Sequence, residues 1–169
     1  MPTTNEYTGL ILLSGADAPG IAAGLFEVLS PFAITIHDVE EISIRGRTVL
    51  TVLIGLNINH TAAIEADLVE FSNSKSLDLA IDFAEIPKAT IEPFRVGARV
   101  TIQQELIKAA DLAAITSAIS AVGGNIISIN RLPSSGTLAL ELVVAGADTP
   151  TVKAALSAFA TNVTVENLS

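Results

Sequence analysis

The sequence predicts an α+β chain built from two copies of one unit with the element order β-α-β-β-α-β. Three observations carry this prediction. Short apolar runs of strand length alternate with segments in which apolar residues recur at helical spacing. Glycine and proline stand at the boundaries between these segments. The pattern of the first half returns in the second half when the chain is shifted by 90 positions, from Leu25 to Ile115.

The first half opens with a predicted apolar strand over residues 7–14, followed by a turn over residues 15–20. Asp17 is placed to cap the helix that follows, and Pro19 is expected in the early positions of that helix. The helix ends near Ser30, because the residue before a proline avoids the helical region. The apolar face of this helix comprises Ile21, Leu25, Val28, Leu29 and Phe32.

A hairpin and a second helix complete the first unit. A long strand is predicted over residues 34–44, with a bulge or bend at residues 37–39, where the side-chain alternation is interrupted. The remaining predicted elements are a turn at residues 45–47, a strand at 49–56, a helix at 61–73 and a strand at 77–83.

The second half repeats this order. Residues 86–94 contain two prolines and are typical of a linker. We therefore expect a first domain over residues 7–86, a linker over 87–97 and a second domain over 98–169. The predicted strands of the second domain cover residues 99–104, 125–132, 138–145 and 163–166, and its predicted helices cover residues 110–122 and a segment after Asp148-Thr149-Pro150.

The two halves share core, helix and turn positions. The matched pairs at a shift of 90 include Leu10 with Val100, Leu12 with Ile102, Leu29 with Ile119 and Gly46 with Gly136. Two ferredoxin-like units follow, each an antiparallel four-stranded sheet with both helices on one face. Since the strands are strongly apolar, we expect the other face of each sheet to be covered by the other copy or by another subunit.

Composition narrows the function. The chain has 169 residues, half of them hydrophobic, and a formal net charge of −9. That charge repels phosphate backbones, so no nucleic-acid partner is expected. The apolar runs fall far short of the about 20 residues that span a membrane, and the first residues lack the basic head of a signal peptide. We expect a cytoplasmic protein with no membrane attachment.

The residues argue against catalysis and against a metal site. The chain has no cysteine, and its two histidines, His37 and His60, stand far apart in the sequence. His60 is interpreted as a solvated loop residue. No Asp-x-Asp pair is available as an aspartyl nucleophile, and the loop at residues 15–20 has no positive residue to hold a phosphate. We expect no catalytic residue, no metal and no cofactor.

The loop at residues 15–20 admits two interpretations. It can be a turn bounded by glycines with an aspartate helix cap. It can also be a small-ligand pocket, because glycine lets backbone N–H groups approach a ligand and a helix N-terminus favours a carboxylate. Asp17 could then receive an ammonium group, so that one loop recognises both ends of an amino-acid zwitterion.

The pattern Gly-x-Asp-x-Pro-Gly after the first strand, followed by a helix and a long bent strand, resembles the ACT domain. This family consists of small regulatory modules that bind amino acids, usually at an interface between copies. The stretches at residues 25–29, 37–40 and 44–47, together with residues 123–126 of the second copy, resemble the tandem ACT region of actinobacterial-type phosphoserine phosphatases. The resemblance extends from about residue 7 to residue 167.

The resemblance implies a regulatory module that binds a small amino acid, with L-serine as the leading ligand, and that forms a homodimer. The implied ligand-binding residues are Asp17, Ala18, Pro19, Gly20, Ile21 and Asn125. Thr35 stands at the position of Asn125 in the first copy. In the second copy Gln104 and Glu105 replace Ser14 and Gly15, and Ala109 and Ala110 replace Pro19 and Gly20, so no equivalent second pocket is expected. We expect the first loop to share its ligand with Asn125 of the other copy or of a partner chain.

Two alternatives stay open. The chain can be the amino-terminal regulatory part of a phosphoserine phosphatase whose catalytic domain is absent from these residues, since the aspartyl nucleophile motif does not occur in them. It can also be an oligomerisation module that binds no ligand.

Overall fold

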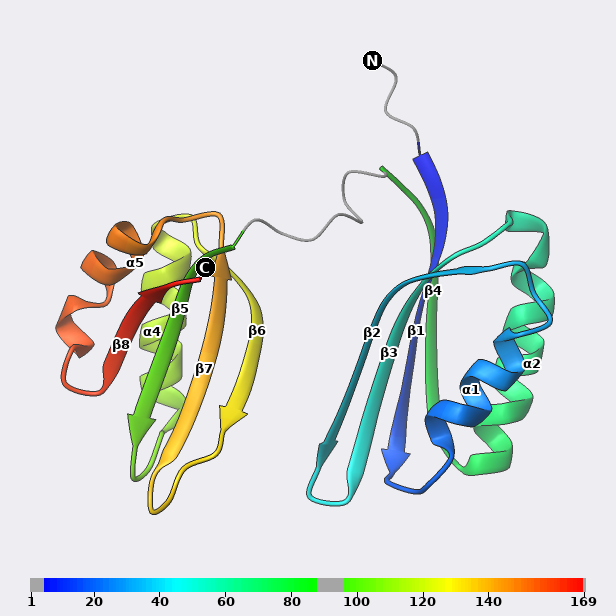
Figure 1. Ribbon diagram of the computed structural model, residues 1–169, viewed down its shortest axis with the longest axis horizontal. Helices are drawn as coiled ribbons and strands as arrows, with labels where there is room; N and C mark the ends of the chain where they lie inside the picture. Colours follow the sequence, from blue (N-terminus) through cyan, green and yellow to red (C-terminus); the bar gives the residue numbers. More distant parts are fainter. Residues whose placement is uncertain (1–4, 88–95, 169) are drawn as a thin grey trace. The chain divides into compact units, whose positions relative to one another are not determined.

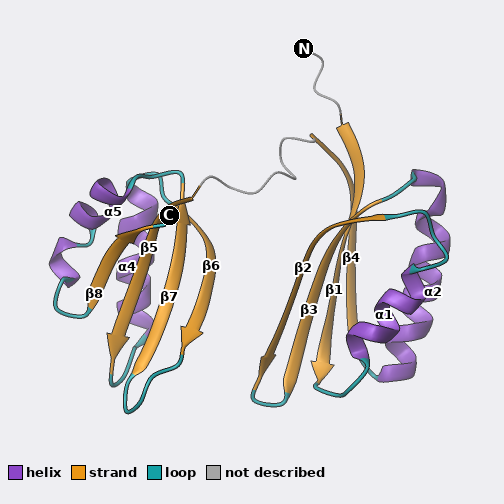
Figure 2. Ribbon diagram, in the orientation of Figure 1, coloured by secondary structure: helices purple, strands orange, loops and turns teal. Residues whose placement is uncertain are grey.

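The computed structural model describes residues 5–87 and 96–168 (Figures 1 and 2). The chain divides into two compact units, Met1–Glu92 and Pro93–Ser169. Each unit has its own sheet and its own hydrophobic core.

The first unit has the order β-α-β-β-α-β, with a short 3-10 turn before its second helix. Its sheet is antiparallel with the strand order β2-β3-β1-β4. Both helices cover one face of that sheet (Figure 1). The elements are β1 (Asn5–Ala16), α1 (Ile21–Leu29), β2 (Thr35–Ile44), β3 (Arg47–Gly55), η1 (Ile58–His60), α2 (Thr61–Lys75) and β4 (Asp78–Pro87).

The second unit repeats this arrangement with the strand order β6-β7-β5-β8. Its second helix is shorter and ends in a 3-10 turn. The predicted fold class is therefore confirmed: α+β, with two antiparallel four-stranded sheets. The elements are β5 (Val96–Gln104), α4 (Ala109–Ala121), β6 (Asn125–Leu132), β7 (Leu138–Ala145), α5 (Thr149–Ala155), η2 (Ser157–Phe159) and β8 (Val163–Asn167).

The predicted linker falls between β4 and β5. β4 continues to Pro87 and β5 already begins at Val96. Residues 88–95, most of the predicted linker, lie outside the described residues. The strands on either side therefore include both ends of the segment predicted as linker, Pro87 at one end and Val96 and Gly97 at the other.

Each core is mainly aliphatic and lies between the sheet and its helices. In the first unit Ile11 and Leu13 of β1 and Leu25 and Leu29 of α1 are fully or almost fully buried. In the second unit Val100, Ile102, Ile115 and Ile119 take the corresponding places. The alternating and helical patterns of the sequence place branched aliphatic side chains on one face of each strand and helix, and burial of these faces stabilises the fold.

The bend predicted at residues 37–39 is a β-bulge. The pairing register of β2 with β3 shifts between Ile36 and Asp38, so His37 is the extra residue. The second unit has the same irregularity between Ile126 and Ser128. The repeat therefore extends to the bulge in the edge strand.

The first strand departs from the predicted repeat by one residue. Ile11 and Leu13 face the core, whereas Leu10 and Leu12 are exposed, so Ile11 and Leu13 correspond to Val100 and Ile102. The prediction that matched Leu10 and Leu12 to these residues was wrong. The first strands therefore match at a shift of 89, and one additional residue between β5 and α4 restores the shift of 90 at the helices. The difference matters because a shift of one residue turns every side chain of a strand to the other face.

The helix-free sheet faces of the two units differ. In the first unit this face exposes Leu10, Leu12, Ile42, Ile44 and Val49. In the second unit it carries polar residues, among them Arg99, whose Nε lies 3.0 Å from Glu141 Oε2 on the neighbouring strand. The face expected to be apolar is therefore aliphatic in the first sheet and polar in the second, and its covering by another copy or subunit stays a prediction. Within the described residues, no helix is long and apolar enough to cross a membrane.

Candidate functional site

The loop between β1 and α1 is tied to the β2–β3 hairpin through Asp17. The Asp17 backbone N–H donates a hydrogen bond of 2.8 Å to the Gly46 carbonyl oxygen. The Ser43 hydroxyl donates a bond of 2.7 Å to Asp17 Oδ2. Residues 17–20 are all exposed. The loop is thus held in place while its surface stays accessible.

Asp17 does not cap α1, and Pro19 is not in the helix. The N-cap is Gly20, with φ at 86°, and no side chain caps the helix there. A positive φ of this size favours glycine, and it turns the chain immediately before the first helical residue, Ile21. Both expectations were wrong because this glycine, and not the aspartate, occupies the boundary.

The N-terminus of α1 presents free backbone donors. The first intrahelical bond runs from the Gly24 N–H to the Gly20 carbonyl oxygen. The N–H groups of Ile21, Ala22 and Ala23 have no acceptor among the described residues, and the first turn contains no acidic side chain. Space is open here, since a Cβ on Gly20 would meet no atom within 4 Å. Free donors and the positive end of the helix dipole favour a carboxylate at this place.

In the second unit an acidic side chain occupies the equivalent helix N-terminus, that of α4. α4 begins at Ala109, and the Lys108 backbone N–H donates 2.9 Å to Asp111 Oδ2. Asp111 therefore places a negative charge in the first turn of the helix. A carboxylate would be repelled from this helix end and attracted to that of α1.

Thr48 adds a buried hydroxyl that sequence reasoning missed. It lies on β3 opposite Gly15 of β1 and Ser43 of β2. The residue is 1% exposed, and its Oγ1 has no hydrogen-bond partner among the described residues. A threonine in a strand is ordinary in sequence, so only the strand pairing shows that it lies between Ser43 and the residues that lead into the loop.

Asn125 is the first residue of β6, exposed, and paired with Ala145. Gly123, with φ at 80°, stands two residues before it and two residues after the last residue of α4, Ala121. Thr35 opens β2 in the same way and pairs with Gly55. The shared position is thus as expected, while a ligand contact of Asn125 stays a prediction.

Neither histidine forms a reactive site. His37 Nε2 lies 2.9 Å from Glu6 Oε1, and the two side chains meet over Gly55, where a Cβ would collide with both. His60 is partly buried at the end of η1, with its ring centroid 6.1 Å from that of Phe32, so the interpretation as a solvated loop residue was wrong. Across residues 5–87 and 96–168, no group of three potential metal-ligating side chains comes together.

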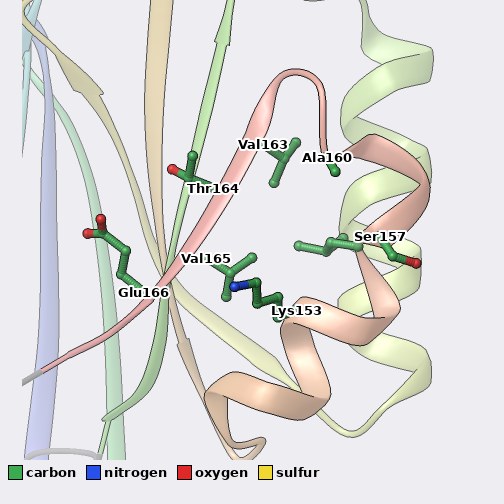
Figure 3. A pocket seen from close by; sticks show the side chains of 8 residues that line it. Lys153, Ser157, Ala160, Val163, Thr164, Val165 and Glu166 are labelled. Atoms are coloured by element: carbon green, nitrogen blue, oxygen red, sulfur yellow. The ribbon is translucent and has the colours of Figure 1, made fainter.

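A separate hollow of about 440 Å³ lies between α5 and β8 (Figure 3). Its walls are mainly apolar, from Leu156, Val163 and Val165, and Lys153 extends across it. Glu166 points away from α5 (Figure 3). None of the residues predicted to bind ligand lines this hollow.

Residues 8–83 match the family model of the ACT domain. The first unit is an ACT domain. The second unit repeats the ACT fold, with the same element order and strand order.

Two curated relatives match most of the chain. It is 32% identical over 158 residues, 92% of its length, to the phosphoserine phosphatase of Streptomyces coelicolor. It is 30% identical over 142 residues, 80% of its length, to the phosphoserine phosphatase of Mycobacterium tuberculosis. The chain spans only 38% and 33% of the length of these relatives, respectively.

Solved structures share the ACT fold at low identity. One is a protein provisionally described as a glycine cleavage system transcriptional repressor, with a TM-score of 0.74, 13% identity and 98% of each chain covered. Another is a protein of Galdieria sulphuraria, with a TM-score of 0.71, 14% identity, and 98% of this chain and 100% of that chain covered. At this identity the likeness concerns the fold alone.

Proposed function

We propose that this chain is a regulatory module that binds a small amino acid at the N-terminus of α1 and forms a homodimer. One observation carries the proposal: α1 has an uncapped N-terminus with three free backbone N–H groups, and the exposed Asp17 stands four residues before Ile21 in the loop that leads to it. The candidate ligand-binding residues are Asp17, Ala18, Pro19, Gly20 and Ile21, with Asn125 as a contributor from another copy of the unit.

The two charges of an amino acid match this arrangement. Its carboxylate would accept hydrogen bonds from the N–H groups of Ile21 and the two residues after it. Its ammonium group would lie against Asp17 Oδ1, which has no hydrogen-bond partner within the described residues, whereas Oδ2 accepts from Ser43. The Ser43 bond holds the carboxylate in place for that contact.

L-serine is the leading ligand on chemical grounds. The two curated relatives are named phosphoserine phosphatases, and removal of phosphate from phosphoserine yields serine. A module attached to such an enzyme would sense the product of the reaction. The match to 38% and 33% of these relatives favours a second candidate function, namely the regulatory part of a larger phosphatase. Under either proposal the two ACT-fold units regulate and do not catalyse.

The test is a thermal-shift panel of the proteinogenic amino acids on the whole chain. A ligand at about 100 times its Kd stabilises the fold by about 2.7 kcal/mol. We expect serine to raise the Tm, and Asp17→Ala to abolish the rise. Asp82→Ala, which removes an exposed carboxylate from β4, is the control and should keep it.

A panel that moves nothing would contradict amino-acid binding. If dimerisation then persists unchanged in Asp17→Ala, the chain is an oligomerisation module. The exposed aliphatic face of the first sheet is the observation that favours this third candidate.

A further inference from the structure

The outer surface of the first unit has a groove between its two helices. α1 and α2 pack side by side on the sheet (Figure 1), and the start of α1 lies at the end of α2. Two neighbouring hollows of about 320 and 520 Å³ follow this seam and share Glu27, Val28 and Phe71. Gly24 has no side chain, and a Cβ there would collide with the Phe71 ring. The ring therefore fills the seam beneath Gly24, and together with Val28 it forms an apolar floor.

The rim of this groove is acidic. Glu27 stands on α1, and Asp67 and Glu70 stand on α2, all three exposed. Among the residues that the structure describes, the carboxylates within 4.0 Å of a basic side chain are Glu6, beside His37, and Glu141, beside Arg99, so these three carboxylates have no basic partner there. The single base at the described part of the groove is Lys75, at the end next to Gly20.

The charge of the whole chain is concentrated in this unit. Residues 5–87 contain twelve Asp and Glu but only three Lys and Arg, an excess of nine negative charges. Residues 96–168 contain five Asp and Glu and four Lys and Arg, an excess of one. A cationic partner is therefore attracted to the first unit, and the groove gives it an apolar place to bind.

We propose that the α1–α2 groove binds an amphipathic helix of a partner protein, with an apolar residue on the Val28–Phe71 floor and Lys or Arg beside Glu27, Asp67 and Glu70. The Lys or Arg side chains of the partner helix lie at the end of the groove away from Lys75 of this chain. This surface borders the proposed amino-acid site at Gly20 and Ala23. The side chains that would hold the partner helix, Val28, Phe71 and the three carboxylates, take no part in that site.

A helix suits the seam better than a strand does. The groove is bounded by two helices and has no free sheet edge, so an extended segment would leave its own backbone groups without partners. A helix satisfies its backbone internally and packs its side-chain ridges between those of two others. The groove follows the whole of α1, Ile21–Leu29, which is about 13 Å long at 1.5 Å per residue and matches between two and three turns of a bound helix.

The experiment measures fluorescence anisotropy of two labelled 18-residue peptides with the whole chain. One peptide is an amphipathic helix of leucine and lysine, and the other has glutamate at every lysine position. We expect the lysine peptide to bind, more weakly as salt is raised, and the glutamate peptide not to bind. The triple variant Glu27→Gln, Asp67→Asn, Glu70→Gln should weaken binding by about tenfold or more.

Two further variants separate the groove from net charge. The matched triple Glu40→Gln, Glu41→Gln, Asp82→Asn removes the same charge from β2 and β4 and should weaken binding less than about threefold. Val28→Asp adds a negative charge but removes the apolar floor, so it should weaken binding, with circular dichroism confirming that the variant is folded. Equal losses in both triples, tighter binding by Val28→Asp, or no binding of the lysine peptide would overturn the proposal. Complete displacement of the peptide by spermine at equal charge concentration would assign the groove to small cations and overturn it as well.

Discussion

At the scale of single residues, Ser43 is the side chain that positions Asp17. Its hydroxyl donates 2.7 Å to one carboxylate oxygen, which leaves the other oxygen for a ligand. Ser43→Ala keeps the charge of Asp17 but frees its orientation. We expect Ser43→Ala to raise the Kd for serine by about three- to tenfold, a smaller loss of affinity than Asp17→Ala causes. The reason is that the variant removes the bond that orients the carboxylate and keeps the carboxylate itself. Isothermal titration of both variants measures this, and an unchanged Kd in Ser43→Ala would show that the bond has no positioning role.

Thr48 and Thr8 form a matched pair of buried threonines. Thr8 is 3% exposed and its hydroxyl donates 3.1 Å to the Ala84 carbonyl oxygen. Thr48 is 1% exposed and its hydroxyl has no partner among the described residues. Thr8→Val should lower the free energy of unfolding by about 1 kcal/mol, because it breaks a bond, whereas Thr48→Val should leave it unchanged or raise it. Urea denaturation of both variants gives the comparison, and equal destabilisation would mean that the Thr48 hydroxyl is satisfied in solution.

At the scale of secondary-structure elements, Gly24 sets how closely α1 approaches α2. Alanine is favoured over glycine inside a helix by about 1 kcal/mol. Here a Cβ would collide with Phe71, which is itself packed in the core. We expect Gly24→Ala to destabilise the chain by about 1–3 kcal/mol despite its higher propensity. Ala23→Gly on the same helix is the control for propensity alone, and a stabilised Gly24→Ala would contradict the packing described for this seam.

Asp148 gives α5 a pH-dependent cap. Hydrogen bonding to the Thr151 side chain, and then to its backbone N–H, lowers the pKa of the Asp148 carboxyl from 3.8. A lowered folded pKa means that the cap stabilises above the unfolded value and that this stabilisation is lost as pH falls through the folded pKa. Asp148→Ala should therefore be less stable than the parent chain at neutral pH, and the difference should vanish in strong acid. Urea curves across that range test this, and a difference that grew toward acid would contradict it.

Most elements could be predicted from local patterns. The hairpins, the bulge at His37 and the repeated element order all follow from alternation, helical spacing and turn residues. The N-cap of α1 and the register of β1 could not be predicted in this way. Gly20 shows its positive φ only in three dimensions, and the one additional residue before α4 is invisible when a single shift is applied to the whole repeat.

The candidate site could be predicted only in part, because some of its features have a local signal in the sequence and others depend on contacts between distant residues. The loop with Asp17 stands out because glycine and proline surround it. Ser43, Thr48 and the free donors of α1 depend on strand pairing and on an absent cap, and neither leaves a local signal in the sequence. Likewise, the seam floored by Val28 and Phe71 brings together residues of two helices that are far apart in the chain.

At the scale of the whole molecule, the two units have diverged within one fold. The first has an uncapped α1, an aliphatic sheet face and almost all of the net charge. The second has Asp111 at the start of α4 and a polar sheet face. The features on which the proposed amino-acid site and the proposed groove depend are therefore concentrated in the first unit, and we expect one amino-acid site per chain.

Isothermal titration of the whole chain with L-serine, performed on the parent and on Asp17→Ala, tests the proposed amino-acid site most directly. We expect one site per chain in the parent and no measurable binding in the variant. The folded state of Asp17→Ala, checked by its thermal melt, should be retained. Binding of serine to Asp17→Ala with unchanged affinity would place the site elsewhere, and a parent chain that binds no amino acid would contradict the proposed function itself.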